Sequence, residues 1–302
     1  MFYEVSKNFP CPKCGNNHWC SFDKEQNIIC CRRNTGSGIY RLDTTGTEYW
    51  LHFLHPSTTY TRNATKPLNP VVATTQLSAS QLNEAYSCLL SNLDLGQFHK
   101  ENLLKRGLTD SQISTNQYKS YSLLRRRQLA LKLQHLFGEH ICKDIPGMYK
   151  DSRGVFVIGG CPGLLIPVRD PSARIVALKI RCYSSTSSRY SYLSSKSHGG
   201  KSPGHPLHFP LAFDFNSKLI RITEGELKAD IATVLSGTPT ISIPGILSWR
   251  MAIPVLKSLK PETVRLAFDM DFKTNPDVAR ALIAAFDEIK SLGFNTEVET
   301  WI

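Results

Sequence analysis

The sequence predicts a mixed α/β protein, α+β overall, made of a small cysteine-rich N-terminal module, a basic α+β subdomain and a C-terminal domain with a mainly parallel four-stranded sheet flanked by helices. Cysteines cluster near the N-terminus, helical periodicity and a hairpin follow, and strands alternate with helices toward the C-terminus. The expected parts are the module at 1–55, a linker at 56–79, the basic subdomain at 80–213 and the C-terminal domain at 214–302.

Composition sets the class of protein. The chain has 302 residues, of which 41% are hydrophobic and 20% charged, so it is globular and long enough for two or three cores. It contains no apolar run of the roughly 18 residues that span a bilayer. The first residues lack the basic and then apolar pattern of a signal peptide. We therefore expect a cytoplasmic protein with no membrane partner.

Cysteine spacing predicts a zinc site in the N-terminal module. Five of the nine cysteines lie within residues 11–31, a clustering that indicates metal binding rather than disulfides in a chain without a secretion signal. Tetrahedral zinc needs four ligands, and the sequence offers more than four. The expected set is Cys11, Cys14, Cys20 and Cys31, with Cys30 or His18 as substitutes. The other four, Cys88, Cys142, Cys161 and Cys182, are expected to be buried small apolar residues.

The module also carries basic and aromatic residues. Strand-like pieces at 27–29 and 48–53 fit a β-rich unit that depends on its metal. Trp19 with Arg32 and Arg33 offers rings and guanidinium groups, a mixture that suits single-stranded nucleic acid. For other aromatic residues of the module, such as Trp50, a place in the module's small core is equally compatible with the sequence.

In the basic subdomain, helical and strand patterns follow one another. We expect helices at 81–92 with Ser80 as N-cap, at 99–105, after a cap at Thr109, and from Arg125 to about Phe137. Strands at 164–168 and 175–180 flank a turn and form a hairpin, and 189–194 adds a third strand. The glycines before Lys201 resemble a P-loop, but Ser195 replaces its first glycine, so we reject that motif.

In the C-terminal domain, strands and helices alternate. We expect strands at 218–223, 240–243, 263–268 and 296–301, with helices at 226–235, 248–259 and 276–292 between them. Such alternation implies parallel strands joined by right-handed crossovers.

Acidic residues stand where two of these strands end. Glu224 closes the first strand, and Asp269 and Asp271 follow the third. Open α/β sheets gather functional groups at the carboxyl ends of their strands, and magnesium prefers hard oxygen ligands together with phosphate oxygens. The pattern therefore predicts metal-dependent chemistry on phosphates.

Charge is divided unevenly along the chain. Residues 1–213 hold 26 basic and 13 acidic residues, and residues 214–302 hold 10 and 12. A basic part that attracts phosphates beside an acidic part that holds cations is typical of a nucleic-acid enzyme. A basic protein without a nucleic-acid partner is the alternative.

These motifs resemble a known family. Glu224-Gly225 and Asp269-Met270-Asp271, each after an apolar strand, resemble the Toprim signature. Segments 163–170, 179–181 and 189–195 are similar to the basic subdomain of DnaG-type DNA primases, which share the order zinc module, basic subdomain, Toprim domain. The closer likeness is to primase-like Toprim proteins of phages, plasmids and mobile elements. It is carried by Cys11-Pro12-Lys13-Cys14-Gly15, Trp19-Cys20, Tyr49–Leu54 and Glu224–Asp230.

The resemblance implies an activity. A DnaG-type primase makes short RNA primers on a single-stranded DNA template from nucleoside triphosphates by two-metal nucleotidyl transfer. It implies that Glu224, Asp269 and Asp271 hold magnesium or manganese, and that zinc is structural. Expected contacts to nucleic acid or nucleotide are Lys179, Arg181, Arg189, Lys201, Lys228, Arg32, Arg33 and Trp19. We expect a bacterial or phage- or plasmid-encoded protein and a helicase, if any, on a separate chain.

The chain departs from the family pattern at two places. Arg33 stands where a cysteine partner of Cys30 would fall, and Asp230 follows Glu224 by six residues, a longer spacing than usual. Two other functions fit the same motifs. One is a Toprim-type metal-dependent nuclease, and the other is a non-catalytic, zinc-bearing protein that binds single-stranded nucleic acid.

Overall fold

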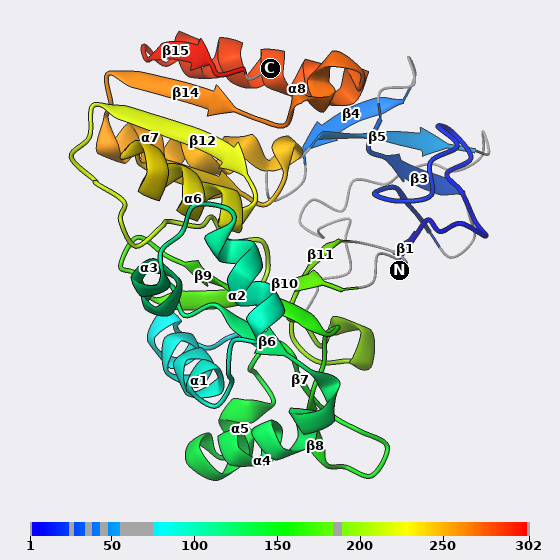
Figure 1. Ribbon diagram of the computed structural model, residues 1–302. Helices are drawn as coiled ribbons and strands as arrows, with labels where there is room; N and C mark the ends of the chain where they lie inside the picture. The colour runs from blue at the N-terminus through cyan, green and yellow to red at the C-terminus, as the bar shows by residue number, and fades with distance from the viewer. Residues whose placement is uncertain are drawn as a thin grey trace. The chain divides into compact units, whose positions relative to one another are not determined.

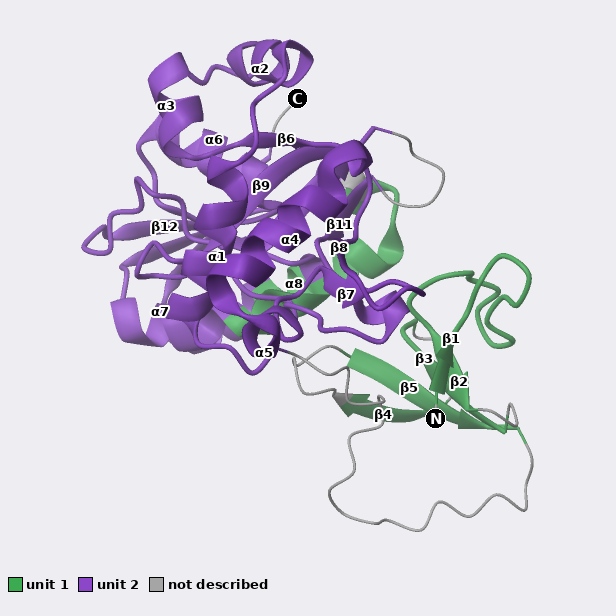
Figure 2. Ribbon diagram, turned by 90° about the horizontal axis from the view of Figure 1, so that it is seen from below, with its two compact units in different colours: residues 1–71, 247–251, 271–285 green, residues 72–246, 252–270, 286–302 purple. Residues whose placement is uncertain are grey.

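A computed structural model describes residues 2–23, 27–33, 38–42, 48–54, 75–183 and 189–300. Two compact units make up the chain (Figure 2). The first contains residues 1–71, 247–251 and 271–285, and the second contains residues 72–246, 252–270 and 286–302. The predicted linker falls largely outside the described residues. None of the described helices is long and apolar enough to cross a membrane.

A five-stranded antiparallel sheet forms the N-terminal module, as predicted for a β-rich unit. Its strands are β1 (Phe2–Glu4), β2 (Ser21–Asp23), β3 (Ile28–Cys31), β4 (Ile39–Leu42) and β5 (Glu48–Phe53), in the order β1-β2-β3-β5-β4. Successive residues of β3 face opposite sides of the sheet. Ile29 and Cys31 pack with Cys11, whereas Cys30 packs with Leu51.

The first half of the second unit is built on an antiparallel sheet. Its strands are β6 (Lys119–Tyr121), β9 (Gly163–Arg169), β10 (Ile175–Cys182) and β11 (Tyr190–Tyr192), in the order β11-β10-β9-β6. The predicted hairpin is confirmed as β9 and β10. Asp170 closes its turn, because one carboxylate oxygen accepts the backbone N–H groups of Ser172 and Arg174. A smaller hairpin joins β7 (Met148–Lys150) to β8 (Phe156–Ile158).

Helices surround this sheet (Figure 1). They are α1 (Ala79–Ser91), α2 (Gln97–Leu104), α3 (Asp110–Thr115), α4 (Arg126–Phe137) and α5 (Glu139–Cys142), with 3-10 turns η1 (Leu123–Arg125) and η2 (Lys196–His198). The predicted caps differ in outcome. Thr109 caps α3 as expected, but Ser78, not Ser80, caps α1 through a reciprocal pair of bonds with Gln81.

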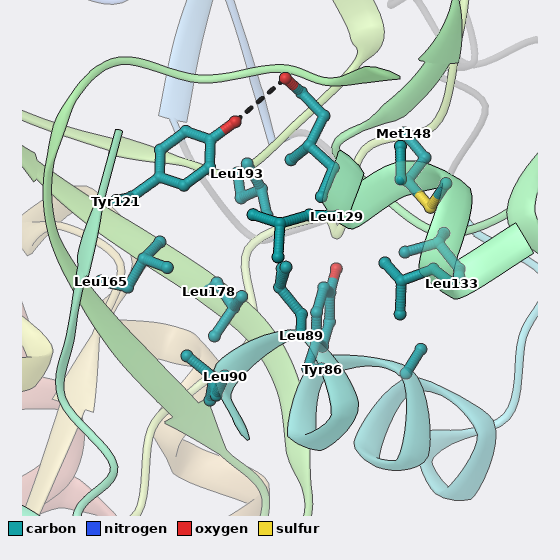
Figure 3. Packing of buried hydrophobic residues seen from close by; sticks show 14 of the residues in the cluster. Tyr86, Leu89, Leu90, Tyr121, Leu129, Leu133, Met148, Leu165, Leu178 and Leu193 are labelled. Atoms are coloured by element: carbon teal, nitrogen blue, oxygen red, sulfur yellow. Dashed lines mark hydrogen bonds between the residues drawn. The ribbon is translucent and has the colours of Figure 1, made fainter. Parts of the chain in front are cut away.

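A large apolar core holds α1, α4 and the sheet together (Figure 3). Tyr86 and Leu90 of α1, Leu129 of α4 and Leu178 of β10 are buried within it. Tyr121 lies at its edge and donates its hydroxyl to the carbonyl of Ile158 at 3.0 Å, so its polar atom is satisfied.

The C-terminal sheet has four parallel strands, as predicted. They are β12 (Leu219–Glu224), β13 (Thr240–Ile243), β14 (Thr263–Ala267) and β15 (Asn295–Val298), in the order β13-β12-β14-β15. Between them run α6 (Glu226–Ser236), η3 (Ile246–Ala252), α7 (Ile253–Leu259), η4 (Met270–Lys273) and α8 (Pro276–Ser291). The single helix expected at 248–259 is split, with Pro254 in the first turn of α7, where its missing N–H is tolerated.

One prediction about cysteines is wrong. Cys161 and Cys182 form a disulfide, with Cα atoms 5.8 Å apart, rather than lying as separate buried thiols. The hairpin register explains the pairing, because Cys182 lies opposite Gly163, two residues beyond Cys161. Cys142 is buried and Cys88 is half-buried, both as free thiols.

Candidate active site and zinc centre

Four cysteines meet in the N-terminal module. The sulfur atoms of Cys11, Cys14, Cys20 and Cys31 all lie within 4.8 Å of one another. The Cys14–Cys20 sulfur distance is 3.7 Å and the Cys20–Cys31 distance is 3.9 Å. Four thiolates around zinc at about 2.3 Å stand roughly 3.8 Å apart in a tetrahedron, so the cluster has the size that zinc requires. The backbone N–H of Arg32 points at Cys20 Sγ, a second contact that orients this sulfur.

Neither substitute ligand joins this cluster. Cys30 faces the other side of β3, and burial raises the pKa of its thiol to about 11, which keeps it protonated. His18 is exposed and its Nδ1 lies 2.7 Å from Asn17 Oδ1. The expected set of four is therefore the one that the structure gathers.

The basic and aromatic residues of the module have separate settings. Trp19 is 58% exposed and meets His18 edge to face. The guanidinium of Arg32 lies 5.3 Å from the ring centre of Tyr49. Arg33 forms an ion pair with Asp277, within the same unit, so its charge is partly balanced there. The role of all three in nucleic-acid binding stays a prediction.

Glu224 and Asp269 lie at the same edge of the parallel sheet. β12 and β14 pair in register up to Thr223 and Ala267, and the Thr223 hydroxyl donates to the Ala267 carbonyl at 2.7 Å. The next residue of one strand is Glu224, and Asp269 follows the other by two residues. The backbone N–H of Ile246 donates to Glu224 Oε2 at 3.0 Å and fixes this carboxylate.

Gly225 turns the chain from β12 into α6. Its φ is +90°, a conformation that side-chain-bearing residues rarely adopt. The turn places Lys228 in the first turn of α6, where its ammonium forms an ion pair with Asp269. Both side chains are about half exposed, at 48% and 49%. The backbone of Asp271 belongs to η4, and its side chain lies outside the described part of the structure.

Lys179 lies in a buried network. Its ammonium is 2.9 Å from Glu226, and it lies 4.8 Å from the ring centre of Tyr192, whose hydroxyl donates to the same carboxylate at 3.1 Å. Burial, and then the charge of Glu226, raises the pKa of Tyr192, so this hydroxyl stays a donor. A contact to phosphate assumes an exposed lysine, whereas Lys179 is 8% exposed.

A second buried carboxylate lies one turn further along α6. Asp230 is 1% exposed and accepts the hydroxyl of Tyr118 at 2.6 Å. Its other oxygen lies 3.0 Å from His208 Nε2. His208 Nδ1 accepts the backbone N–H of Arg169, so the proton is on Nε2 and is donated to Asp230.

The remaining predicted contacts are spread over the basic subdomain. Lys201 pairs with Asp144 at 3.2 Å. Arg181 donates to Asn102 Oδ1 at 3.0 Å. Arg189 is exposed, and burial together with the charges of Arg106 and Arg189 lowers the pKa of Arg181. Arg181 and Arg189 are thus close enough to repel each other.

Sequence reasoning missed the roles of Glu226 and Asp230. Both lie on the buried face of α6, four residues apart, and each takes donors from the basic subdomain. Two acidic residues at helical spacing among apolar neighbours were a visible sign of buried pairing. Their partners were not visible, because they lie far away in the sequence.

Comparisons with known proteins bear on the fold of the chain. No protein-family model matches the chain, and no curated protein does. Among solved structures, the zinc-binding and RNA polymerase domains of Aquifex aeolicus primase match with a TM-score of 0.55 and 15% identity, over 74% of this chain and 55% of that one. The RNA polymerase domain of Mycobacterium tuberculosis primase DnaG matches with a TM-score of 0.53 and 14% identity, over 74% and 76%.

The chain has the fold of a DnaG-type primase core. The same Mycobacterium domain bound to double-stranded DNA matches with a TM-score of 0.53, 15% identity and 74% coverage of each chain. At these identities the likeness concerns the fold, and the chain spans just over half of the Aquifex chain.

Proposed function

We propose that this protein is a DNA primase, a nucleotidyltransferase that makes short RNA primers on single-stranded DNA. The observation that carries the proposal is the position of Glu224 and Asp269 at the ends of two adjacent parallel strands, within a fold shared with primase RNA polymerase domains. Open α/β sheets use this edge for ligands. Because the sequence identity to these primases is only 14–15%, the site supports the proposal more strongly than the structural similarity does.

The residues at this edge fit magnesium or manganese. Carboxylate oxygens are the ligands that these ions prefer, and the ammonium of Lys228 beside Asp269 indicates that a positive charge is favoured here. Glu224, Asp269 and Asp271 would hold the ions. Bound ions would supply charge neutralisation for the attacking and leaving oxygens of the transferred nucleotide.

The chain's own groups prepare this site. The Ile246 N–H holds Glu224 in one orientation, and the Thr223–Ala267 bond keeps the two strand ends together. Lys228 pairs with Asp269, and its half-exposed ammonium is free to exchange that carboxylate for a triphosphate oxygen. Such positioning lowers the barrier, since little reorganisation is left for the reaction itself.

Other parts of the chain would serve the template. The basic subdomain presents arginines. The structure of the M. tuberculosis DnaG domain in complex with a double-stranded DNA oligomer carrying a 6-nucleotide overhang matches this chain with a TM-score of 0.50. By analogy, we assign single-stranded DNA and nucleoside triphosphates as partners, a structural role to zinc, and a cytoplasmic location in a bacterial cell, with phage or plasmid encoding included. A helicase would act from a separate chain.

Nucleotide incorporation tests the proposal. Labelled ribonucleotides are supplied on a single-stranded DNA template with magnesium or manganese, for the wild type and for Asp269→Ala and Asp271→Ala. Short template-dependent products from the wild type alone support a primase. Metal-dependent cleavage of the template without products indicates a nuclease, and binding that survives both substitutions without either activity indicates a binding protein.

A further inference from the structure

Two exposed aromatic side chains lie together on the basic subdomain, one in the first turn of α2 and one just after β10. Figure 1 labels both elements. Phe98 is 66% exposed and Tyr183, just after β10, is 59% exposed. Their ring centres are 6.1 Å apart. One face of Tyr183 stacks on His99 at 4.9 Å and an angle of 15°. Adjacent exposed rings form a contiguous apolar patch, a feature that is typical of interaction sites.

Hydrogen bonds fix His99, on which Tyr183 stacks, and the backbone of Tyr183. Ser120 Oγ accepts the backbone N–H of Gly96 at 2.7 Å and lies 2.7 Å from His99 Nδ1, so one hydroxyl is hydrogen-bonded to both groups. Burial, and then the charge of Arg181, lowers the pKa of His99, which keeps the ring neutral at neutral pH. The Tyr183 backbone N–H donates to the Pro162 carbonyl at 3.1 Å. The surface is therefore preorganised.

Three arginines belong to the same part of the subdomain as the rings, and two of them are bound to Asn102, one helical turn after Phe98 in α2. Arg106 and Arg181 both donate to Asn102 Oδ1, at 3.1 and 3.0 Å, and the Arg189 carbonyl accepts the backbone N–H of Cys182, the residue after Arg181, at 3.0 Å. Within the described part of the chain, none of these three arginines forms an ion pair with a carboxylate. Three like charges without a counter-charge favour an anion with several negative groups.

We propose that Phe98 and Tyr183 form a stacking platform for an unpaired base of single-stranded nucleic acid, whose phosphates meet Arg106, Arg181 and Arg189. Rings that accept any base beside unpaired guanidinium groups are the two elements of single-strand recognition. A duplex hides its bases and would use only the charges. The platform deepens the proposed function and rests on it, since it names where the template is held.

Binding to matched oligonucleotides tests the platform. Fluorescence anisotropy compares the full chain with oligothymidylate, an abasic oligomer of the same length and a duplex. Phe98→Ala and Tyr183→Ala should each weaken oligothymidylate binding roughly 5- to 100-fold, the effect of losing one stacked base. Binding of the abasic oligomer and the duplex should not change. Phe98→Tyr and Tyr183→Phe keep an aromatic ring and should retain the wild-type affinity for oligothymidylate. Leu124→Ala, at a 95% exposed position, should not change that affinity.

Arg106→Ala has a different expected result. This substitution should lower the affinity for oligothymidylate, for the abasic oligomer and for the duplex. It should also reduce the dependence of binding on salt, because it removes a phosphate contact. The platform would be overturned if Phe98→Ala and Tyr183→Ala bound oligothymidylate as tightly as the wild type. It would also be overturned if these variants lost as much affinity for the abasic oligomer as for oligothymidylate. A wild type that binds no single strand would overturn the proposed function as well. If the ring variants bind oligothymidylate more weakly but the wild type incorporates no nucleotides, the platform is supported and only the primase activity is contradicted.

Discussion

At the scale of single residues, neighbouring side chains have opposite roles. Cys30 and Cys31 are adjacent in the sequence, yet the pleat of β3 turns one into the apolar side and the other into the four-cysteine cluster. Each role follows from the direction of the side chain, because the two residues are chemically identical.

This contrast gives the first prediction. Cys31→Ser should remove a ligand and abolish stable zinc binding, whereas Cys30→Ser should keep it. Zinc content per chain is measured by atomic absorption after gel filtration. Retention of zinc by the Cys31 variant with loss in the Cys30 variant would reverse the assigned ligand set.

Asp230 is a second residue whose surroundings decide its contribution. It accepts bonds from Tyr118 and His208 while 1% exposed. In Asp230→Asn the amide NH₂ faces one of these donors, so we expect a loss of about 1–3 kcal/mol in the free energy of unfolding. Urea denaturation measures it, with the exposed Asp287→Asn as control, expected to change stability by less than about 0.5 kcal/mol. Equal stability of the two variants would contradict the buried network.

At the scale of elements, helix α6 connects the acidic edge to the basic subdomain. Its N-terminus follows Glu224, and its buried face carries Glu226 and Asp230. Both carboxylates are bonded to residues that precede the parallel sheet in the sequence. The helix therefore fixes the direction from which Lys228 approaches Asp269.

A double-mutant cycle tests this connection. Glu226→Gln leaves Lys179 buried without its counter-charge and should cost about 3–5 kcal/mol. Lys179→Met alone should also destabilise. Together the two changes should cost less than their sum by about 0.5–3 kcal/mol, because the double variant leaves no unpaired charge. Strict additivity in urea denaturation would show that the two groups do not interact.

The turn before α6 gives a prediction with a matched control. Gly225 and Gly237 both have positive φ, +90° and +68°, at the two ends of the helix. A Cβ at either position meets no atom closer than 4.0 Å, so backbone conformation is the main cost, about 1–3 kcal/mol. Both alanine variants should lose stability. Nucleotide incorporation should fall only in Gly225→Ala, since only that residue adjoins Glu224, and an equal fall in both would contradict its positioning role.

At the scale of the whole molecule, local signals predicted most of the architecture. Strand–helix alternation predicted the four parallel strands, and cysteine spacing predicted the cluster of four cysteines, because both depend on residues close in sequence. The Ser78–Gln81 capping box is also visible in the sequence as a serine followed three residues later by a glutamine, and it outweighs Ser80 as the N-cap. The parallel direction of the strands also implied that Glu224 and Asp269 lie at the same edge of the sheet.

Contacts between distant residues were not predictable in this way. Tyr118 and Asp230 are 112 residues apart, and Lys179 and Glu226 are 47 apart, so their pairing depends on how the two sheets pack. The Cys161–Cys182 disulfide likewise depends on the register of one hairpin. These tertiary contacts decide which basic and acidic residues are buried in pairs and which remain exposed.

One measurement tests the central claim most directly, namely nucleotide incorporation on single-stranded DNA by the wild type and Glu224→Gln at several magnesium concentrations. The substitution keeps the size of the side chain and removes its charge, so the fold, followed by circular dichroism, should persist. Template-dependent products should fall roughly 100- to 1000-fold, as is typical when one electrostatic group is removed from such a site. Equal products from both proteins would contradict a catalytic site at this edge of the sheet.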